Sequence, residues 1–390
     1  MKGAATVLMA VALALTPAYT IRSHAGRYPT TLLEVALLLA IAVGLIALRG
    51  RLPWRNPYTL PGLLLLAGAT IGVFVSPDRT GALGEWRAFF AEPMAAGLVV
   101  AGLARGSDSR VRGLLAGLAA ASIAVALVNL VHVVPLQLAH RIDVANPPVA
   151  IFQNANQEAL FLVPLDGLAL AFVLFSSRRA DQVAAAVVLV ITIPAVLLSY
   201  SRGGIAALAV AALVVVLLHP RRWLLLAPVA ALLAVGVGLL PGIRRRLAVE
   251  LDPTSPNNTL HSRLGLWQGT VRMLTHHPLF GAGLRGFDTD VAPYYADPFK
   301  VAFPHDLVLN FWSETGLAGL AGFIWLSLAA VVSGARGVHS RELSRVLSVG
   351  VLAFVAAVWV HGAVDVPYLK NDLAVAFWAI LGVHAGTLGE

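Results

Sequence analysis

The stretch QVAAAVVLVITIPAVLLSYSRGGIAALAVAALVVVLLHP, residues 182–220, contains one charged residue, Arg202. The apolar runs on either side of it, 182–201 and 203–220, are each close to the roughly 20 residues that an α-helix needs to cross the hydrocarbon core of a bilayer. The stretch therefore predicts two transmembrane helices joined by a very short turn, with Arg202 at the border between membrane and water.

The same pattern recurs along the whole chain. Runs free of Asp, Glu, Lys and Arg cover residues 3–21, 57–77, 113–140, 182–201, 203–220, 223–243, 315–335, 346–364 and 373–389. Three more runs, each interrupted by a single acid, cover 30–48, 88–104 and 159–177. The strands of a membrane β-barrel would alternate in polarity, which these runs do not. We therefore expect an all-α fold, a polytopic bundle of about twelve transmembrane helices that forms one integral membrane domain over residues 1–390.

The composition agrees with a membrane protein. Hydrophobic residues make up 58% of the 390 residues and charged residues 12%, and the mean hydropathy is +0.80. Because soluble domains carry about 25% charged residues, this composition excludes a soluble enzyme, a coiled coil and a disordered protein. The chain has no cysteine, which excludes a disulfide framework and thiolate catalysis. Lys2 and the apolar run after it also fit a signal peptide loosely, and cleavage there would leave the remaining topology unchanged.

The distribution of Lys and Arg between the short loops indicates how the bundle is oriented. Fourteen of these residues fall on one side and seven on the other, in step with all twelve spans. We therefore expect both termini in the cytoplasm. Segment 242–304 is then a long extracytoplasmic loop between spans nine and ten, with short amphipathic helices. Long loops cross membranes largely regardless of their charge, so the basic residues of this segment do not count against the rule.

Arg202 is the first candidate functional residue. Gly203 and Gly204 follow it at the start of the next predicted helix. A helix N-terminus opened by glycines and flanked by an arginine is typical of a phosphate-binding site. The alternative is an arginine that merely extends from a helix end to the membrane surface, which is common. Arg202 lies on the side with fewer basic residues, and this favours the functional interpretation.

The long loop adds an arginine and a histidine. Residues 263–276 predict a short amphipathic helix on which Arg263 and Trp267 share a face, although a helix anchored at the interface by its tryptophan is the alternative. His305 follows Pro304 near the start of a span, where a histidine can serve as a general base. A hydrogen-bonded structural histidine is the alternative. Two more polar residues follow at roughly helical spacing, Asn310 and Glu314.

Other polar patterns predict neither a metal nor a cofactor. Asp288 and Asp290 resemble the metal-binding motif of nucleotide-sugar transferases, but they lie in the loop where such donors are not normally available. The pair 276–277, two histidines, lacks further ligands with the spacing of a metal site. Residues 281–286 match G-x-G-x-x-G, but no strand precedes them, so a dinucleotide site is not expected. We expect no nucleic-acid partner.

At these residues the chain resembles the O-antigen ligase and polymerase family of bacterial envelope glycan assembly, membrane proteins of the GT-C-like kind. The motifs occur in the family's order and span roughly residues 110–385. They are Phe152-Gln153-Asn154-Ala155-Asn156, Ser199-Tyr200-Ser201-Arg202-Gly203-Gly204, Arg263 with Trp267, Pro278-Leu279-Phe280-Gly281-Ala282-Gly283, the set His305, Asn310, Glu314, Gly316 and Gly319, and His361-Gly362-Ala363-Val364-Asp365.

The resemblance implies a metal-independent glycosyltransferase in the bacterial inner membrane, with its active site facing the periplasm. The family takes a glycan from undecaprenyl diphosphate and passes it to a hydroxyl of the lipid A core, in ligases, or of another lipid-linked glycan, in polymerases. Arg202 and Arg263 would stabilise the departing diphosphate, and His305 would deprotonate the acceptor in an inverting displacement. The expected substrate-binding residues are Arg285, Asn156, Glu314, Trp267 and Asn310.

A ligase is our main expectation, and two alternatives stay open. A polymerase shares the donor chemistry, so only the acceptor distinguishes it from a ligase. A transporter or flippase belongs to a different class, and it predicts two related halves and ionisable residues near the membrane midplane. Glu158 and Asp166 fit that second alternative. The other polar residues gather on one face, however, and no internal repeat is evident, so chemistry at the membrane surface is favoured.

Overall fold

The structure is a computed structural model that describes residues 1–25, 28–143, 147–239, 241–252, 255, 258–295 and 301–388. Of the expected long loop, residues 253–254, 256–257 and 296–300 therefore lie outside the described residues. The elements up to residue 138 are α1 (Lys2–Ala14), the 3₁₀ turn η1 (Thr16–Thr20), β1 (Arg22–Ala25), β2 (Tyr28–Thr31), α2 (Leu32–Ala47), α3 (Thr59–Val75), α4 (Arg79–Glu85), the π-helical turn η2 (Trp86–Ala91), α5 (Glu92–Ala104) and α6 (Asp108–Leu138). The later elements are α7 (Ala155–Phe175), α8 (Arg179–Leu198), α9 (Arg202–Leu218), α10 (Arg222–Leu239), α11 (Pro241–Leu251), α12 (Thr259–His276), α13 (Phe287–Asp290), α14 (Leu307–Gly337), α15 (Glu342–Gly362) and α16 (Asn371–Thr387).

Each of the twelve apolar runs predicted from the sequence overlaps at least one helix, although several runs extend beyond the helix that they overlap. Six helical segments are long and apolar enough to cross a membrane: Arg79–Ala104, Asp108–Leu138, Ala155–Phe175, Arg179–Leu198, Leu307–Gly337 and Glu342–Gly362. Shorter apolar helices of 10–17 residues are Lys2–Ala14, Leu32–Ala47, Thr59–Val75, Arg202–Leu218 and Arg222–Leu232. The helical class is thus confirmed, whereas the count of twelve spans stays a prediction.

A β-hairpin is the one departure from the all-α expectation within the described part of the chain. Strands β1 and β2 pair antiparallel, with Arg22 opposite Thr31. The first predicted span does not continue as a helix to its end, because Pro17 has no N–H and lies in the 3₁₀ turn η1 instead. Thr31 then starts α2 through a capping box, in which its N–H donates to Glu34 at 2.8 Å and its Oγ1 accepts from Glu34 N at 3.2 Å.

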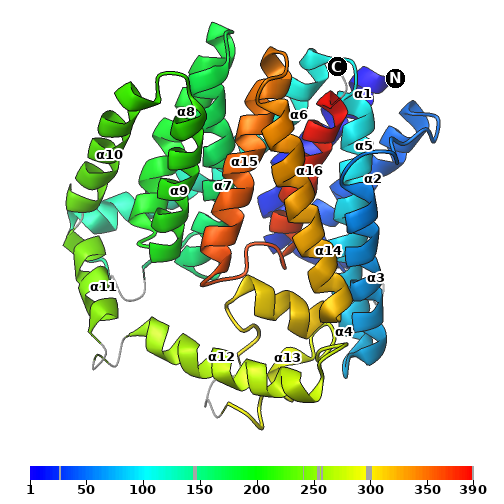
Figure 1. The fold of residues 1–390 in the computed structure, drawn as a ribbon, viewed down its shortest axis with the longest axis vertical. Coiled ribbons are helices and arrows are strands. Elements are labelled where there is room, and N and C mark those ends of the chain that lie inside the picture. The colour runs from blue at the N-terminus through cyan, green and yellow to red at the C-terminus, as the bar shows by residue number, and fades with distance from the viewer. Residues whose placement is uncertain are drawn as a thin grey trace.

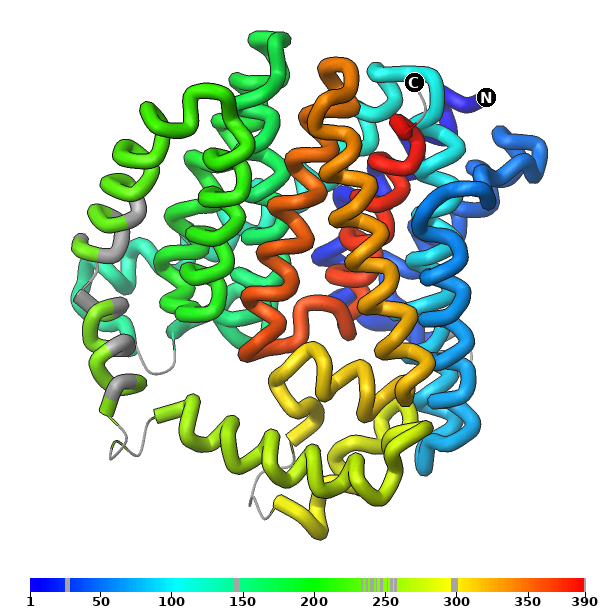
Figure 2. Tube along the Cα trace, viewed as in Figure 1, coloured from blue at the N-terminus to red at the C-terminus, as the bar shows by residue number. Residues whose placement is uncertain are grey.

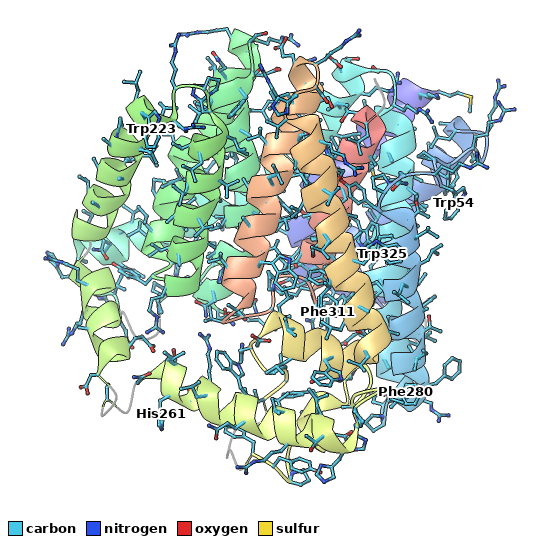
Figure 3. The ribbon with its side chains drawn as sticks, in the orientation of Figure 1. Trp54, Trp223, His261, Phe280, Phe311 and Trp325 are labelled. Carbon is cyan, nitrogen blue, oxygen red and sulfur yellow. The ribbon has the colours of Figure 1, made fainter. Side chains whose placement is uncertain are left out.

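The two termini lie at one end of the bundle, and α12 and α13 lie at the other (Figure 1). We call these the terminal end and the α12 end. Two exposed tryptophans that stand beside arginines in the sequence, Trp54 and Trp223, lie in the half nearer the terminal end, whereas His261 and Phe280 lie at the α12 end (Figure 3). Tryptophan is enriched where membranes meet water. The arrangement agrees with the expected topology, and the side of the membrane that each end faces stays a prediction.

Helices that are distant in sequence pack closely together. Helix α3 lies against α14, and α5 lies against α16 (Figure 2). Glycines permit this approach: a Cβ added to Gly68 would lie 2.2 Å from Gly319 N, and one added to Gly382 would lie 2.4 Å from Gly97 O. Small residues at helix contacts are typical of membrane proteins, because they let two backbones approach. The contact between Gly68 and Gly319 fixes the long helix α14 against α3, and the contact between Gly382 and Gly97 fixes α16 against α5.

Helix α14 has a kink at Gly316, which adopts φ +65°, a left-handed conformation that favours glycine. Residues 278–286 fill the kink. Leu317 N donates to Leu279 O at 3.0 Å, and a Cβ at Gly316 would lie 2.5 Å from that same oxygen. The kink separates a short first part of α14, at the α12 end, from the long remainder (Figure 1). It therefore orients the segment that follows His305.

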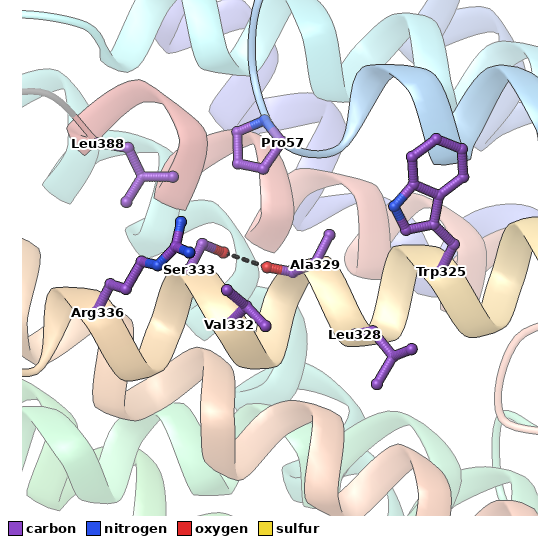
Figure 4. Close-up of a pocket in the computed structure, with 8 residues that line it drawn as sticks. All are labelled: Pro57, Trp325, Leu328, Ala329, Val332, Ser333, Arg336 and Leu388. Carbon is purple, nitrogen blue, oxygen red and sulfur yellow. Dashed lines mark hydrogen bonds between the residues drawn. The ribbon is translucent and has the colours of Figure 1, made fainter.

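Two apolar grooves lie between the helices. One, of about 610 Å³, runs along α14, with Arg336 and Leu388 near one end and Trp325 at the other (Figure 4). The second, of about 300 Å³, lies between α6, α7 and α8, with Arg112 and Asp181 among its lining residues. Neither groove contains a residue that the sequence assigns to the active site. That site lies instead where several helices begin or end.

Candidate active site

Arg202 is the first residue of α9, at the sharp turn that follows α8. Tyr200 has a left-handed φ of +53° in this turn, and Ser201 caps α9 by accepting a hydrogen bond from Gly204 N at 3.2 Å. The Arg202 guanidinium pairs with the Glu250 carboxylate of α11, and it donates a hydrogen bond to the Oγ1 of Thr259, at the start of α12, at 2.9 Å. The turn thus directs the guanidinium to the start of α12.

Gly203 lets the start of α9 approach the end of α15. A Cβ added at this position would lie 2.8 Å from His361 Cδ2. The His361 side chain is buried, and its Nδ1 has no hydrogen-bond partner among the residues that the structure describes. The glycine after the arginine is therefore needed for steric reasons, because any side chain would displace His361 or α9.

Helix α12 carries the predicted pair Arg263 and Trp267, and it begins at Thr259, earlier than the expected residue 263. Trp267 Nε1 donates to Pro304 O at 2.9 Å, which anchors α12 to the residue before His305. Arg263 is half-buried, and the described residues offer it no hydrogen bond or ion pair. Burial lowers the pKa of Arg263, the charge of Asp365 raises it, and the charge of Arg202 lowers it. The guanidinium groups of α9 and α12 therefore lie close enough to repel each other.

His305 stands between Pro304 and Asp306, the residue that caps α14 by accepting from Leu309 N at 2.8 Å. Its φ of +52° is uncommon for a residue with a side chain. The Nδ1 atom of His305 lies 3.3 Å from Asp365 Oδ1, and the histidine side chain is 41% exposed. A histidine with one nitrogen on a carboxylate and a partly open ring has the geometry of a general base.

Asp365 connects three of these elements. It lies between α15 and α16, and its Oδ2 accepts a hydrogen bond from Asn156 Nδ2, in the first turn of α7, at 3.3 Å. Burial raises the pKa of Asp365. The hydrogen bond from His305, followed by the charges of His305, His361 and Arg263, outweighs burial and holds this pKa below its ordinary value. The sequence signal for this residue was its place in the His361-to-Asp365 element, to which we assigned no role.

We name Arg202, Arg263, His305 and Asp365 the arginine–histidine group. Arg202 lies in α9, Arg263 in α12, His305 just before α14, and Asp365 just after α15. A hydrogen bond or a charge interaction connects each of them to another member or to Glu250. The structure therefore brings together the three residues that the sequence predicts to be catalytic. Asn156 contacts this group directly, and Trp267 contacts it through Pro304.

The predicted residues Glu314 and Arg285 lie in a second group. Glu314 Oε2 accepts a hydrogen bond from Arg285 N at 2.7 Å. The Arg285 guanidinium pairs with Asp78 at 3.0 Å and with Glu85 at 3.5 Å. These contacts attach residues 278–286 to the kink of α14 and to α4. We name Asp78, Glu85, Arg285 and Glu314 the loop-anchoring group. The substrate-binding roles of Arg285 and Glu314 stay predictions.

Asn310 is fully buried in the first part of α14. Neither its Oδ1 nor its Nδ2 has a hydrogen-bond partner among the residues that the structure describes. Burying an amide without hydrogen bonds is costly. The substrate-binding role of Asn310 stays a prediction. In the described ranges there is no group of three or more His, Asp or Glu side chains that could hold a metal ion.

One segment of the chain matches a known family. Residues 185–324 match the family model described as O-antigen ligase. This segment is similar to the O-antigen ligase family. It includes Arg202, Arg263, Arg285, His305 and Glu314, whereas Asn156 and Asp365 lie outside the match. No curated protein matches the chain significantly. The family of this model is membrane glycosyltransferase-like and is associated with lipid-linked glycans, so the match supports an enzyme of this general kind.

Proposed function

We propose that the protein is an O-antigen ligase of a bacterial inner membrane. It transfers a glycan from undecaprenyl diphosphate to a hydroxyl of the lipid A core, at the α12 end of the bundle, which faces the periplasm. The observation that carries this proposal is the arginine–histidine group, in which residues as distant in sequence as Arg202 and Asp365 meet at one site.

The two arginines stabilise the leaving group, the diphosphate. As the bond between the anomeric carbon and the diphosphate oxygen breaks, negative charge grows on the diphosphate. Arg202 and Arg263 carry guanidinium groups that form strong, bidentate hydrogen bonds with phosphate oxygens. Fixed positive charge at the place where charge develops lowers the barrier, without the cost of reorganising solvent. Arg263 is available for this purpose because the described residues do not pair it.

His305 acts on the acceptor as a general base. If its Nδ1–H donates to Asp365, its Nε2 is the basic nitrogen and accepts the proton of the acceptor hydroxyl as the hydroxyl oxygen attacks the anomeric carbon. The carboxylate of Asp365 orients the ring and stabilises the imidazolium that forms. The new glycosidic bond forms on the face opposite the leaving diphosphate, so the anomeric carbon is inverted. Asn156 orients Asp365 through its amide.

Reconstitution tests this proposal. The purified chain in liposomes receives a lipid-diphosphate-linked glycan together with either a lipid A core or a second lipid-linked glycan. We expect a glycan on the lipid A core only when both substrates are present. Lengthening of the lipid-linked chains in place of this product would assign the protein as a polymerase. Movement of the donor across the bilayer without any new glycosidic bond would assign a flippase and would overturn the proposal.

A further inference from the structure

The carboxylate of Glu250, in α11, is surrounded by hydrogen-bond donors. Its Oε1 accepts from the Arg202 guanidinium, from Thr259 Oγ1 at 2.7 Å and from Thr259 N at 3.1 Å. Its Oε2 accepts from Leu260 N at 3.0 Å. Burial raises the pKa of Glu250, but the Thr259 hydroxyl, the Leu260 N–H and the Arg202 charge together hold it below its ordinary value. Glu250 is therefore a bound anion.

Helix α12 does not need this carboxylate as a cap. Asn258 already occupies the N-cap position, where its Oδ1 accepts from His261 N at 3.0 Å. Glu250 instead accepts hydrogen bonds from the backbone N–H groups of the first two residues of α12, which have no acceptor within the helix. Backbone N–H groups at a helix start, a hydroxyl and a guanidinium are the donors that bind phosphate in proteins.

Two guanidinium groups lie near Glu250, and this carboxylate forms an ion pair with only one of them. Arg202 contributes one positive charge that Glu250 pairs, and Arg263 contributes a second that no described side chain pairs. Glu250 and Arg202 each influence the pKa of Arg263, so all three groups are near one another. A diphosphate would bring more negative charge and more acceptor oxygens than the carboxylate that now occupies this place.

The position of α11 at the edge of the molecule would allow the Glu250 side chain to move away from Arg202 and the start of α12. This helix packs mainly on α10, at the edge of the molecule (Figure 1). A displacement of α11 would therefore require little repacking of the bundle that carries Arg202 and His305. The contacts of Glu250 with the start of α12 would be exchanged for contacts between α12 and a ligand.

We propose that Glu250 occupies the phosphate-binding position of the donor site, and that the diphosphate displaces it to take the same donors, namely Arg202, the Thr259 hydroxyl and the first N–H groups of α12. This inference rests on the proposed function, and it adds Thr259 and Glu250 to the site. Glu250 then competes with the donor. The affinity of the site for diphosphate is reduced by the fraction of molecules in which the carboxylate is bound.

The test is equilibrium binding of inorganic pyrophosphate, and of undecaprenyl diphosphate in detergent, to the full-length protein. Glu250→Gln removes the negative charge but keeps the size of the side chain. If the carboxylate occupies the site in about nine of ten molecules, the variant should bind pyrophosphate about tenfold more tightly. Arg202→Ala should lose pyrophosphate binding. The double variant that combines Glu250→Gln with Arg202→Ala should bind no more tightly than Arg202→Ala, because the hydrogen-bond donor that Glu250→Gln frees is Arg202 itself.

Two matched controls separate competition from a structural role. Glu85→Gln removes the same charge beside Arg285, and it should not change pyrophosphate affinity. Asn258→Ala removes the cap of α12 together with the hydrogen bond from Asn258 Nδ2 to Glu250 O at 3.1 Å. It loosens α11 but keeps the carboxylate, so it should tighten binding less than Glu250→Gln does. Unchanged or weaker binding by Glu250→Gln, with binding lost in Arg202→Ala, would overturn the competition and leave the proposed function intact. Binding that is equally strong in Arg202→Ala would place the diphosphate elsewhere and overturn both proposals.

Discussion

The arginine–histidine group and the loop-anchoring group both lie toward the α12 end, and both contain residues from the motifs that the sequence predicts to be functional. They differ in the balance of their charges. In the loop-anchoring group, the guanidinium of Arg285 pairs with the carboxylates of Asp78 and Glu85. The backbone N–H of Arg285 donates a hydrogen bond to the carboxylate of Glu314. In the arginine–histidine group, Arg263 has no partner among the described residues, and the ring of His305 is partly open.

The difference teaches how to separate chemistry from architecture within one set of motifs. A group whose guanidinium is paired with carboxylates of the same group holds the backbone in place and offers no free guanidinium to an anionic ligand. A group with a guanidinium that the described residues do not pair, together with a partly exposed base, is prepared for an anionic substrate and a proton transfer. Mutations in the two groups should therefore fail in different ways, and the following experiments test that contrast.

The largest effect is expected for His305→Ala. Loss of a general base typically reduces a rate by about 10²–10⁴-fold, because the acceptor must then lose its proton without help. The contact with Asp365 lies at a partly exposed surface, so thermal unfolding and donor binding should stay near those of the wild type. Initial transfer rates and melting temperatures of the purified proteins provide the measurement. A well-folded variant with near-normal turnover would rule out His305 as the base.

The second effect concerns Arg202 and Arg263. Removing either guanidinium should raise the barrier by about 2.7–4 kcal/mol, by analogy with the loss of an oxyanion-hole donor. Lysine keeps the charge but loses the planar fork, so each Arg→Lys variant should lie between alanine and wild type. If both arginines bind one diphosphate, their effects should be strongly non-additive in the double variant.

The controls for the arginines are Arg244→Ala and Arg336→Ala. Both residues are exposed, and Arg336 lines the apolar groove along α14 (Figure 4). We expect little change in transfer for either variant under saturating donor. Mild and additive defects at Arg202 and Arg263, no larger than those of the controls, would show that the two arginines do not share a diphosphate.

A smaller effect is expected for Asp365→Asn. A residue that orients a functional side chain typically contributes about 10–100-fold, by analogy with the partners of metal ligands. The hydrogen bond and charge of His305 hold the pKa of Asp365 below its ordinary value near 3.9, despite the opposing effect of burial. Its contribution to stability is therefore present at neutral pH and is lost only as the pH falls through this lowered value.

The pH profile makes that prediction specific. Asp365 stays ionised between about pH 6 and 9, so a change in the ratio of wild-type to Asp365→Asn rates over this range reflects the loss of its charge beside the His305 ring and not its own protonation. A ratio near one at every pH would rule out an orienting role for Asp365. Asn156→Ala, which removes the other side-chain partner of the carboxylate but keeps its charge, should reduce the rate less and give a flat ratio.

Asp365 also shows where prediction from the sequence stops. The helices could be predicted, because the length of an apolar run is a local property and every predicted run overlaps a helix. Arg202, Arg263 and His305 could be named because each stands at a helix end beside a proline, a glycine or an amphipathic segment. The contact between His305 and Asp365 depends on how α14 and α15 pack, and no local pattern encodes it.

The hairpin and Glu250 were missed for related reasons. Residues 22–31 contain a proline and polar residues that fit a loop, and their pairing depends on the chain turning back on itself. Glu250 follows three arginines in the sequence and resembles an ordinary solvated charge there. Its partner, Arg202, lies 48 residues away, and only the approach of α11 to α9 brings them together.

A still smaller effect on chemistry is expected for Glu314→Gln and Arg285→Ala. The first weakens the acceptor of the Arg285 N–H, and the second removes partly exposed ion pairs, which typically contribute about 0–1 kcal/mol each. We expect transfer to fall by less than about tenfold, together with a lower melting temperature. A loss as large as that of Arg202→Ala, with unchanged melting, would assign these residues to substrate binding and would end the contrast between the two groups.

The smallest expected effect is none: transfer should persist in excess EDTA. The leaving group is already a diphosphate, and two guanidinium groups supply the positive charge that Mg²⁺ supplies in other phosphate chemistry. The residues most similar to a metal motif, Asp288 and Asp290, lie in α13, where Asp288 accepts a hydrogen bond from its neighbour Thr289 at 3.3 Å. Initial rates with EDTA, beside a metal-dependent transferase treated in the same way, provide the measurement. Loss of transfer on chelation and its recovery with Mg²⁺ would add the carboxylates of α13 to the site. The pairing of the guanidinium groups would then no longer be enough to separate the residues that act in transfer from those that hold the fold.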